Sequence, residues 1–243
     1  MGNVQEIKEK VKIFFASPVY STLVLVPLLV VVILVSSAVF LAVEGTEYKW
    51  TYYDAAYYVI TSITTIGYGN YTPSTTGGKI LTIFYIVLFV PLTMLTLAKT
   101  CQFITLGAKY LWMKLFGCLG KRNANCKVEN VSLPLIIPVL VLLVYILIGS
   151  AIFLVLEKEQ VWLSYFDMLY FVFVSLSTIG FGDIFPLNKD GFPFFVIYIF
   201  GGLILVAVCI NVGFFDSVNT ESERKDEDDK TTQNEEAQAI DTT

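Results

Sequence analysis

Four long stretches of this 243-residue chain consist almost entirely of apolar side chains, and most charged residues lie between them. A helix needs about 20 predominantly apolar residues to cross a bilayer. One such run could also be the buried helix of a soluble protein, but four in one chain predict an all-α membrane protein. The predicted transmembrane helices are Ser21–Val43, Ile80–Leu106, Leu133–Leu156 and Phe192–Phe215.

The two halves of the chain repeat one another. The segment Ser37–Ile86 aligns without a gap with Ser150–Ile199. Each half contains an apolar span, a short aromatic segment, a glycine-rich motif and a second span. The short segments, Asp54–Thr64 and Asp167–Ser177, are about half as long as a span, which is typical of re-entrant helices. An aspartate at the start suits the N-terminus of such a pore helix.

A glycine-rich motif follows each short segment. Non-helical backbone is tolerated at membrane depth only inside protein or beside water, and glycine permits backbone conformations that aim carbonyls at one axis. Rings of carbonyl oxygens can replace the water shell of K⁺. We therefore predict two selectivity-filter loops that bind K⁺. The first loop comprises Thr65, Ile66, Gly67, Tyr68 and Gly69, and the second comprises Thr178, Ile179, Gly180, Phe181 and Gly182. We expect K⁺ to bind at every residue of each loop except its last glycine. Thr64, Asn70 and Asp183 are expected to support the loops.

One chain supplies only half of such a filter. A closed ring of carbonyls around an ion needs about four strands, and each chain contributes two. A two-fold symmetric homodimer is the simplest closure, and its pore would have pseudo-four-fold symmetry. Pairing with a related chain is an open alternative.

These motifs resemble those of the two-pore-domain potassium channels. That family is similar in having a tyrosine in the first filter and a phenylalanine in the second. The resemblance implies a channel that conducts a background K⁺ current and is gated mainly at the filter, with Asp183 bracing it. The likeness covers Val19 to about Phe215. Further matching segments are Gly78-Lys79-Ile80, Phe84-Tyr85, Pro91-Leu92-Thr93 and Cys209-Ile210-Asn211.

One departure from that family is the short connection between the first span and the first pore helix. Only Gly45–Tyr53 lies between Glu44 and Asp54. Most animal members carry a helical cap of some fifty residues there, so the resemblance is to a cap-less member. Helix packing alone would then hold the dimer together.

Lysine and arginine gather on one side of the predicted spans, the side that usually faces the cytoplasm. Both termini are therefore expected in the cytoplasm. The protein itself is expected in the plasma membrane or in an intracellular membrane. Its expected partners are membrane lipids, and no nucleic acid is expected. The expected segments are a cytoplasmic N-terminus (1–18), a first pore repeat (19–106), a cytoplasmic linker (107–131), a second pore repeat (132–215) and a disordered acidic tail (216–243).

The sequence contains little that indicates a gating stimulus. A voltage sensor needs basic residues arrayed within a span, and the two arginines, Arg122 and Arg224, lie outside the spans. Pro91 could kink the second span and the pair Gly201-Gly202 could hinge the fourth. Close helix packing explains such glycines equally well. Glu44 and Glu157 end the first and third spans; placement at the membrane interface is the simpler interpretation, and hydrogen bonding around the filter the alternative.

Other functions are less consistent with the motifs. A poorly selective cation channel and a non-conducting regulatory subunit both remain compatible with the sequence. A subunit of a potassium uptake transporter is disfavoured, because those proteins carry four degenerate repeats. An enzyme is the least favoured class, since no nucleophile–base pair or phosphate loop is visible. No cofactor is expected apart from permeant K⁺, and without any histidine the usual sensor of near-neutral pH is missing.

Overall fold

The computed structural model describes residues 17–116, 133–157, 163–186 and 188–214, and all regular structure in these ranges is helical. Most of the predicted N-terminal segment and central linker, and all of the predicted tail, lie outside the described residues. The long helices are α2 (Pro18–Tyr48), α4 (Thr76–Phe116), α5 (Ile136–Leu156) and Phe192–Phe214, called the fourth span below; the short ones are α3 (Tyr52–Ile63) and α6 (Tyr165–Leu176).

Each of the four long helices is long and apolar enough to cross a membrane, which confirms the all-α architecture and the four predicted spans. Many of their apolar side chains point away from the protein, among them Ile83 at 64%, Ile148 at 56% and Ile197 at 73% exposure. Such a surface is expected where the solvent is lipid hydrocarbon rather than water.

Helix α4 extends well beyond the predicted second span. It has 41 residues and is therefore roughly 60 Å long at 1.5 Å per residue. The hydrocarbon core of a bilayer is about 30 Å thick. The helix continues past Lys99 and Lys109 into the segment predicted as a linker, because helix formation there does not depend on the apolar pattern that defines the span.

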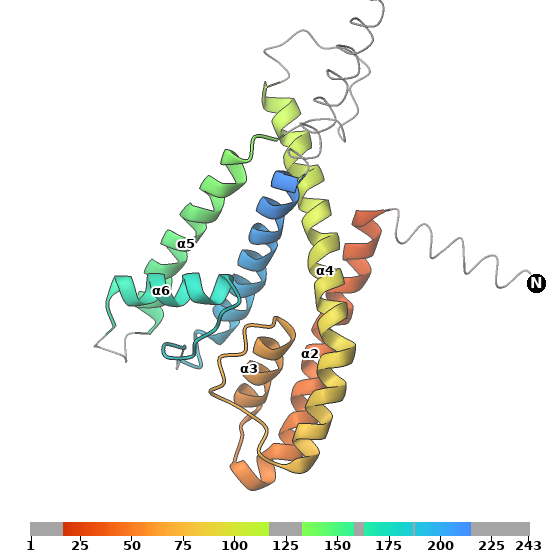
Figure 1. Ribbon diagram of the computed structural model, residues 1–243, viewed down its shortest axis with the longest axis vertical. Helices are drawn as coiled ribbons and strands as arrows, with labels where there is room; N and C mark the ends of the chain where they lie inside the picture. The colour runs from red at the N-terminus through yellow and green to blue at the C-terminus, as the bar shows by residue number, and fades with distance from the viewer. Residues whose placement is uncertain (1–16, 117–132, 158–162, 187, 215–243) are drawn as a thin grey trace, which may run out of the picture.

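The two repeats are packed in the same way. Figure 1 shows α2 beside α4 with α3 against them, and α5 beside α6 with the fourth span, in blue, nearby. In the first repeat, the ring of Phe40 meets Tyr58 at 5.0 Å and Tyr85 at 5.5 Å. The matching rings in the second repeat are Phe153, Phe171 and Tyr198, at 5.4 and 5.1 Å. The sequence repeat is therefore also a structural repeat.

Candidate functional site

The short helices begin with a matched pair of capping boxes. The Thr51 backbone N–H donates to Asp54 Oδ2 at 2.8 Å, and the Ser164 N–H to Asp167 Oδ2 at 2.7 Å. The sequence predicted that these helices begin at Asp54 and Asp167, but each begins two residues earlier. Each aspartate occupies the third helical position, where its side chain closes the capping box.

The carboxylates in these caps are held in their charged form. Burial by itself would raise the pKa of Asp54, but hydrogen bonds from Thr51 and Tyr71 and the nearby charge of Lys189 outweigh burial, so the pKa lies below its usual value. Hydrogen bonds from Ser164 lower the pKa of Asp167. Negative charge at a helix N-terminus complements the helix dipole, so both caps stabilise the short helices that they begin.

The glycine motifs adopt an unusual backbone in which positive φ occurs at every second residue. In the first motif the values are 59° at Thr65, 58° at Gly67 and 82° at Gly69; in the second, Thr178, Gly180 and Gly182 have 56°, 58° and 74°. A positive φ is rare for a β-branched residue and costs on the order of 1–3 kcal/mol. Residues with positive φ alternate with residues that lack it, and such alternation can turn successive carbonyls to the same side of the chain, as a carbonyl-lined ion path requires.

Backbone N–H groups of both motifs are bonded to the ends of the short helices. Gly67 donates to the Thr61 carbonyl at 3.0 Å, and Ile179 and Gly180 donate to the Val174 carbonyl at 3.1 and 3.2 Å. These bonds also satisfy carbonyls at the helix C-termini, which otherwise lack partners. Each motif is thus fixed through its donors, while its own carbonyl oxygens are not needed for that attachment.

The two motifs lie side by side at the same level. A Cβ atom on Gly180 would lie 2.1 Å from the Ile66 carbonyl oxygen, and one on Gly182 would lie 2.1 Å from the Tyr68 oxygen. The fold thereby brings all ten predicted filter residues into one region, although they come from segments more than a hundred residues apart in the chain. Glycine at these two positions lets the strands approach each other.

The surroundings of the two motifs differ. Ile66 and Tyr68 are 3% and 5% exposed, whereas Ile179 and Phe181 are 54% and 64% exposed. The Tyr68 hydroxyl is hydrogen-bonded to Ser175 Oγ on α6. Phe181 has no hydroxyl, so the second motif cannot form the equivalent bond. Ser175 was not among the predicted site residues. Its alignment with Ser62 of the first repeat was the only feature of the sequence that could have indicated a role for it.

A family model described as "Ion channel" matches residues 28–106 and 140–214, which is more than half of the chain and includes both repeats. The chain belongs to this ion-channel family. It is also 29% identical over 185 residues to "TWiK family of potassium channels protein 7" of Caenorhabditis elegans, a match that covers 67% of this chain and 32% of the relative. The chain therefore spans about a third of the length of that curated relative.

These matches confirm the resemblance to two-pore-domain potassium channels drawn from the motifs. Together with the four apolar helices, they identify the channel as an integral membrane protein.

The supporting residues of the two repeats have different contacts. The Asp183 side chain is hydrogen-bonded to Tyr170, whose ring stacks on Phe181 at 6.4 Å. The matching atoms in the first repeat, Asn70 Nδ2 and Tyr57 Oη, are buried without a hydrogen-bond partner among the described residues. Asp183 thus contacts the second filter through Tyr170, and bracing of the filter by Asp183 stays a prediction. The hydroxyl of the remaining supporting residue, Thr64, donates to the Ile60 carbonyl at 2.8 Å.

Two carboxylates hold the segments that follow the filters. Glu44 and Glu157 are 0% and 5% exposed, so the interpretation that their side chains reach out to the membrane interface was wrong. The backbone N–H groups of Ser74 and Thr75 donate to Glu44 at 3.1 and 3.2 Å, and that of Asn188 donates to Glu157 at 3.3 Å. Glu44 thereby links the end of the first span to the loop after the first filter, and Glu157 links the end of the third span to the loop after the second filter.

The candidate hinge glycines lie at close contacts within the fourth span. A Cβ atom on Gly201 would lie 2.8 Å from Tyr145 Oη, and one on Gly202 would lie 2.4 Å from Leu176 Cδ2. These contacts support the close-packing interpretation, and a hinge at these positions stays a prediction. Pro91 lies inside α4, which continues as a helix on both sides of it.

Proposed function

We propose that this chain forms a potassium-selective channel that conducts a background current and is gated mainly at its filter. The alternating positive φ values of the two adjacent motifs are the observation that carries the proposal. This backbone directs carbonyl oxygens toward one path, and carbonyl rings of this kind replace the hydration shell of K⁺. The similarity to a relative named as a potassium channel supports the same ion.

The short helices support this function electrostatically. Each ends directly before its filter, so its negative C-terminal end points toward the proposed ion path. Their N-terminal ends are neutralised by Asp54 and Asp167. A cation in front of the filters would therefore be favoured by two helix ends per chain. On this proposal, K⁺ is the permeant ion and no other cofactor takes part.

The reversal potential of the purified channel in planar bilayers, with K⁺ on one side and Na⁺ on the other, tests this function. We expect reversal near the K⁺ equilibrium potential and little dependence of the open probability on voltage, because no span carries arginine. Reversal near zero would contradict K⁺ selectivity and favour a poorly selective cation channel. Absence of current from correctly folded protein would favour a regulatory subunit.

We also propose that the functional channel is a two-fold symmetric dimer. The glycines of the second motif lie against carbonyls of the first, whereas Gly67 and Gly69 have no described atom within 4 Å of where a Cβ would be. The exposed side of the second motif, with Ile179 and Phe181, is equally uncovered. A second copy that placed its second motif against the first motif of this chain would cover both surfaces and close a ring of four strands.

Light scattering of the detergent-solubilised channel, corrected for bound detergent, tests the assembly. We expect the protein mass of two 27.2 kDa chains. A mass of one chain under conditions that preserve K⁺ flux would contradict the dimer, because a single chain offers half of the carbonyl ring. We further propose that the channel lies in the plasma membrane and that both termini of each chain face the cytoplasm.

A further inference from the structure

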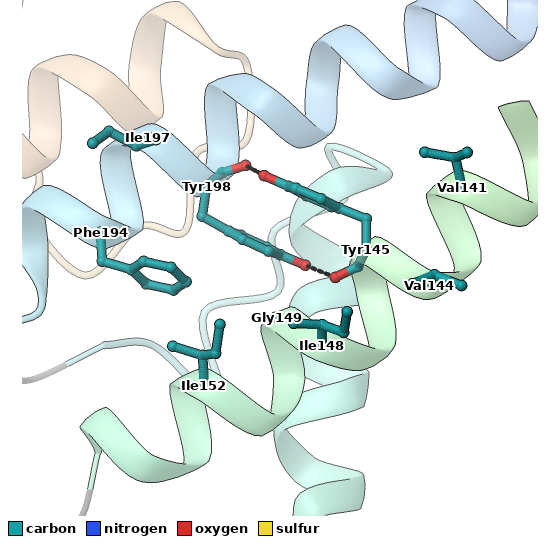
Figure 2. A pocket seen from close by; sticks show the side chains of 9 residues that line it. All are labelled: Val141, Val144, Tyr145, Ile148, Gly149, Ile152, Phe194, Ile197 and Tyr198. Atoms are coloured by element: carbon teal, nitrogen blue, oxygen red, sulfur yellow. Dashed lines mark hydrogen bonds between the residues drawn. The ribbon is translucent and has the colours of Figure 1, made fainter.

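A groove between α5 and the fourth span has features that neither the filter nor the proposed dimer uses. Its volume is about 380 Å³, within the range of about 300–1,000 Å³ that ligand pockets occupy. Figure 2 shows its walls, with one row of side chains from α5 and another from the fourth span. The lining consists of Val141, Val144, Tyr145, Ile148, Gly149, Ile152, Phe194, Ile197 and Tyr198.

Two tyrosines join the helices within this groove. The Tyr145 hydroxyl donates to the Tyr198 carbonyl at 2.7 Å, and the Tyr198 hydroxyl donates to the Tyr145 carbonyl at 3.1 Å. Figure 2 shows that their rings are stacked. The ring centroids are 4.5 Å apart and the ring planes differ by 6°. Gly149 makes room for this pair, because a Cβ atom there would lie 2.1 Å from the Tyr198 ring.

The tyrosine pair leaves the groove without a free hydrogen-bond donor. Both hydroxyls are turned to main-chain carbonyls, and the other lining side chains are hydrocarbon. A polar ligand would gain no hydrogen bond from these side chains and would lose its own to water. The chemistry of the groove therefore fits a hydrocarbon chain.

The groove is continuous with the surface that meets the lipid. Val144, Ile148 and Ile197 on its rim are 53%, 56% and 73% exposed and belong to transmembrane helices. Phe194 and Tyr198 lie near the start of the fourth span, and the α5 lining runs from Ile152, near the end of that helix, back past its middle to Val141. The groove therefore opens to the membrane leaflet on the filter side and extends toward the middle of the bilayer. Molecules dissolved in that leaflet reach it directly.

We infer that this groove retains one acyl chain of a membrane phospholipid from that leaflet. Lipid tails are as apolar as the side chains, so the hydrophobic effect cannot distinguish a bound chain from a bulk one. Retention comes instead from the number of van der Waals contacts, which a concave wall increases. A chain in the groove would lie along both helices that the tyrosine pair joins.

The first repeat provides a matched surface for comparison. Its residues Leu28, Val31 and Phe84 correspond to Val141, Val144 and Ile197 and are 44%, 55% and 65% exposed. Val32 and Ser36 occupy the positions of Tyr145 and Gly149, so the reciprocal tyrosine pair cannot form there. Retention of an acyl chain is therefore expected at the second repeat and only ordinary lipid contact at the first.

Photolabelling can separate these two surfaces. The full-length channel is reconstituted in vesicles that contain phosphatidylcholine with a diazirine on its acyl chain, and the labelled residues are mapped by mass spectrometry. We expect roughly threefold or greater labelling of the groove over the matched first-repeat surface, since extra packing contacts are individually weak. Equal labelling of the two surfaces would overturn the inference, as would labelling by a diazirine fatty acid but not by the phospholipid.

A pair of substitutions controls for surface exposure. Ile148→Phe fills the groove, and Val35→Phe adds the same side chain at the matching position of the first repeat. We expect Ile148→Phe to abolish the excess labelling and Val35→Phe to leave it unchanged, with elution volume and K⁺ flux showing that both variants are folded. Excess labelling that persists in folded Ile148→Phe protein would contradict the site. The inference requires a membrane-embedded chain and not K⁺ selectivity, so its failure would leave the proposed function intact.

Discussion

Replacement of Gly180 by alanine is expected to abolish the K⁺-selective current. Gly180 has a φ of +58°, and its new Cβ atom would lie 2.1 Å from the Ile66 carbonyl oxygen and 2.8 Å from the carbon of that carbonyl. Both atoms belong to backbone and cannot rotate away. We expect the K⁺ flux to fall on the order of a hundredfold, the loss that a misplacement of about 1 Å causes at preorganised sites.

Gly107 provides the matched control for this substitution. It lies in α4 with φ in the ordinary helical region, and no described atom lies within 4 Å of a Cβ atom there. Gly107→Ala should leave current and reversal potential unchanged, since alanine is the better helix former by about 1 kcal/mol. A wild-type reversal potential in Gly180→Ala protein would refute the filter assignment and with it the proposed function.

The corresponding first-repeat variant distinguishes a strained backbone from a contact between subunits. Gly67 also has a φ of +58°, but a Cβ atom would meet no described atom of its own chain. In the proposed dimer, a carbonyl from the second copy would occupy that space. Gly67→Ala should therefore reduce the current as Gly180→Ala does and should also weaken the dimer in light scattering. Loss of current without any change in dimer stability would indicate that backbone strain alone acts at Gly67.

Replacement of Glu44 by alanine is expected to destabilise the channel on the order of 2–4 kcal/mol, because each donor left without an acceptor costs about 1–3 kcal/mol. Glu44 is fully buried and accepts the backbone N–H groups of Ser74 and Thr75. Gly78 leaves space for it, since a Cβ atom there would lie 1.8 Å from Glu44 Oε1. For a chain of this size the expected fall in Tm is roughly 5–10 °C.

Thermal unfolding in detergent measures this effect, with Asp190→Ala as the control carboxylate. Asp190 is exposed in the loop after the second filter, and an exposed substitution usually changes stability by less than about 0.5 kcal/mol. Glu44→Gln should recover part of the loss, because its amide oxygen still accepts a hydrogen bond. If Glu44→Ala and Asp190→Ala had the same Tm, the hydrogen bonds of Glu44 would not stabilise the segment after the filter.

The spans, the repeat and the filter motifs were all predicted from the sequence. Each depends on a local pattern: apolar side chains over the width of a bilayer, or glycines at positions where only glycine suits the backbone. The starts of α3 and α6 were predicted two residues late, at Asp54 and Asp167. A capping box depends on the side chain three residues earlier, in Thr51 and Ser164, so the apolar pattern alone does not reveal it.

Other features were decided by tertiary structure alone. The sequence treats the two motifs as equivalent, yet Tyr68 is buried against Ser175 while Phe181 is exposed, because only the first motif has the other repeat of its own chain behind it. Likewise, nothing in the local sequence distinguishes Glu44 from an interfacial acid. Its burial requires Gly78 and the loop after the filter, which are distant in sequence. Local patterns determine which segments enter the membrane, whereas contacts between distant segments determine what each side chain does there.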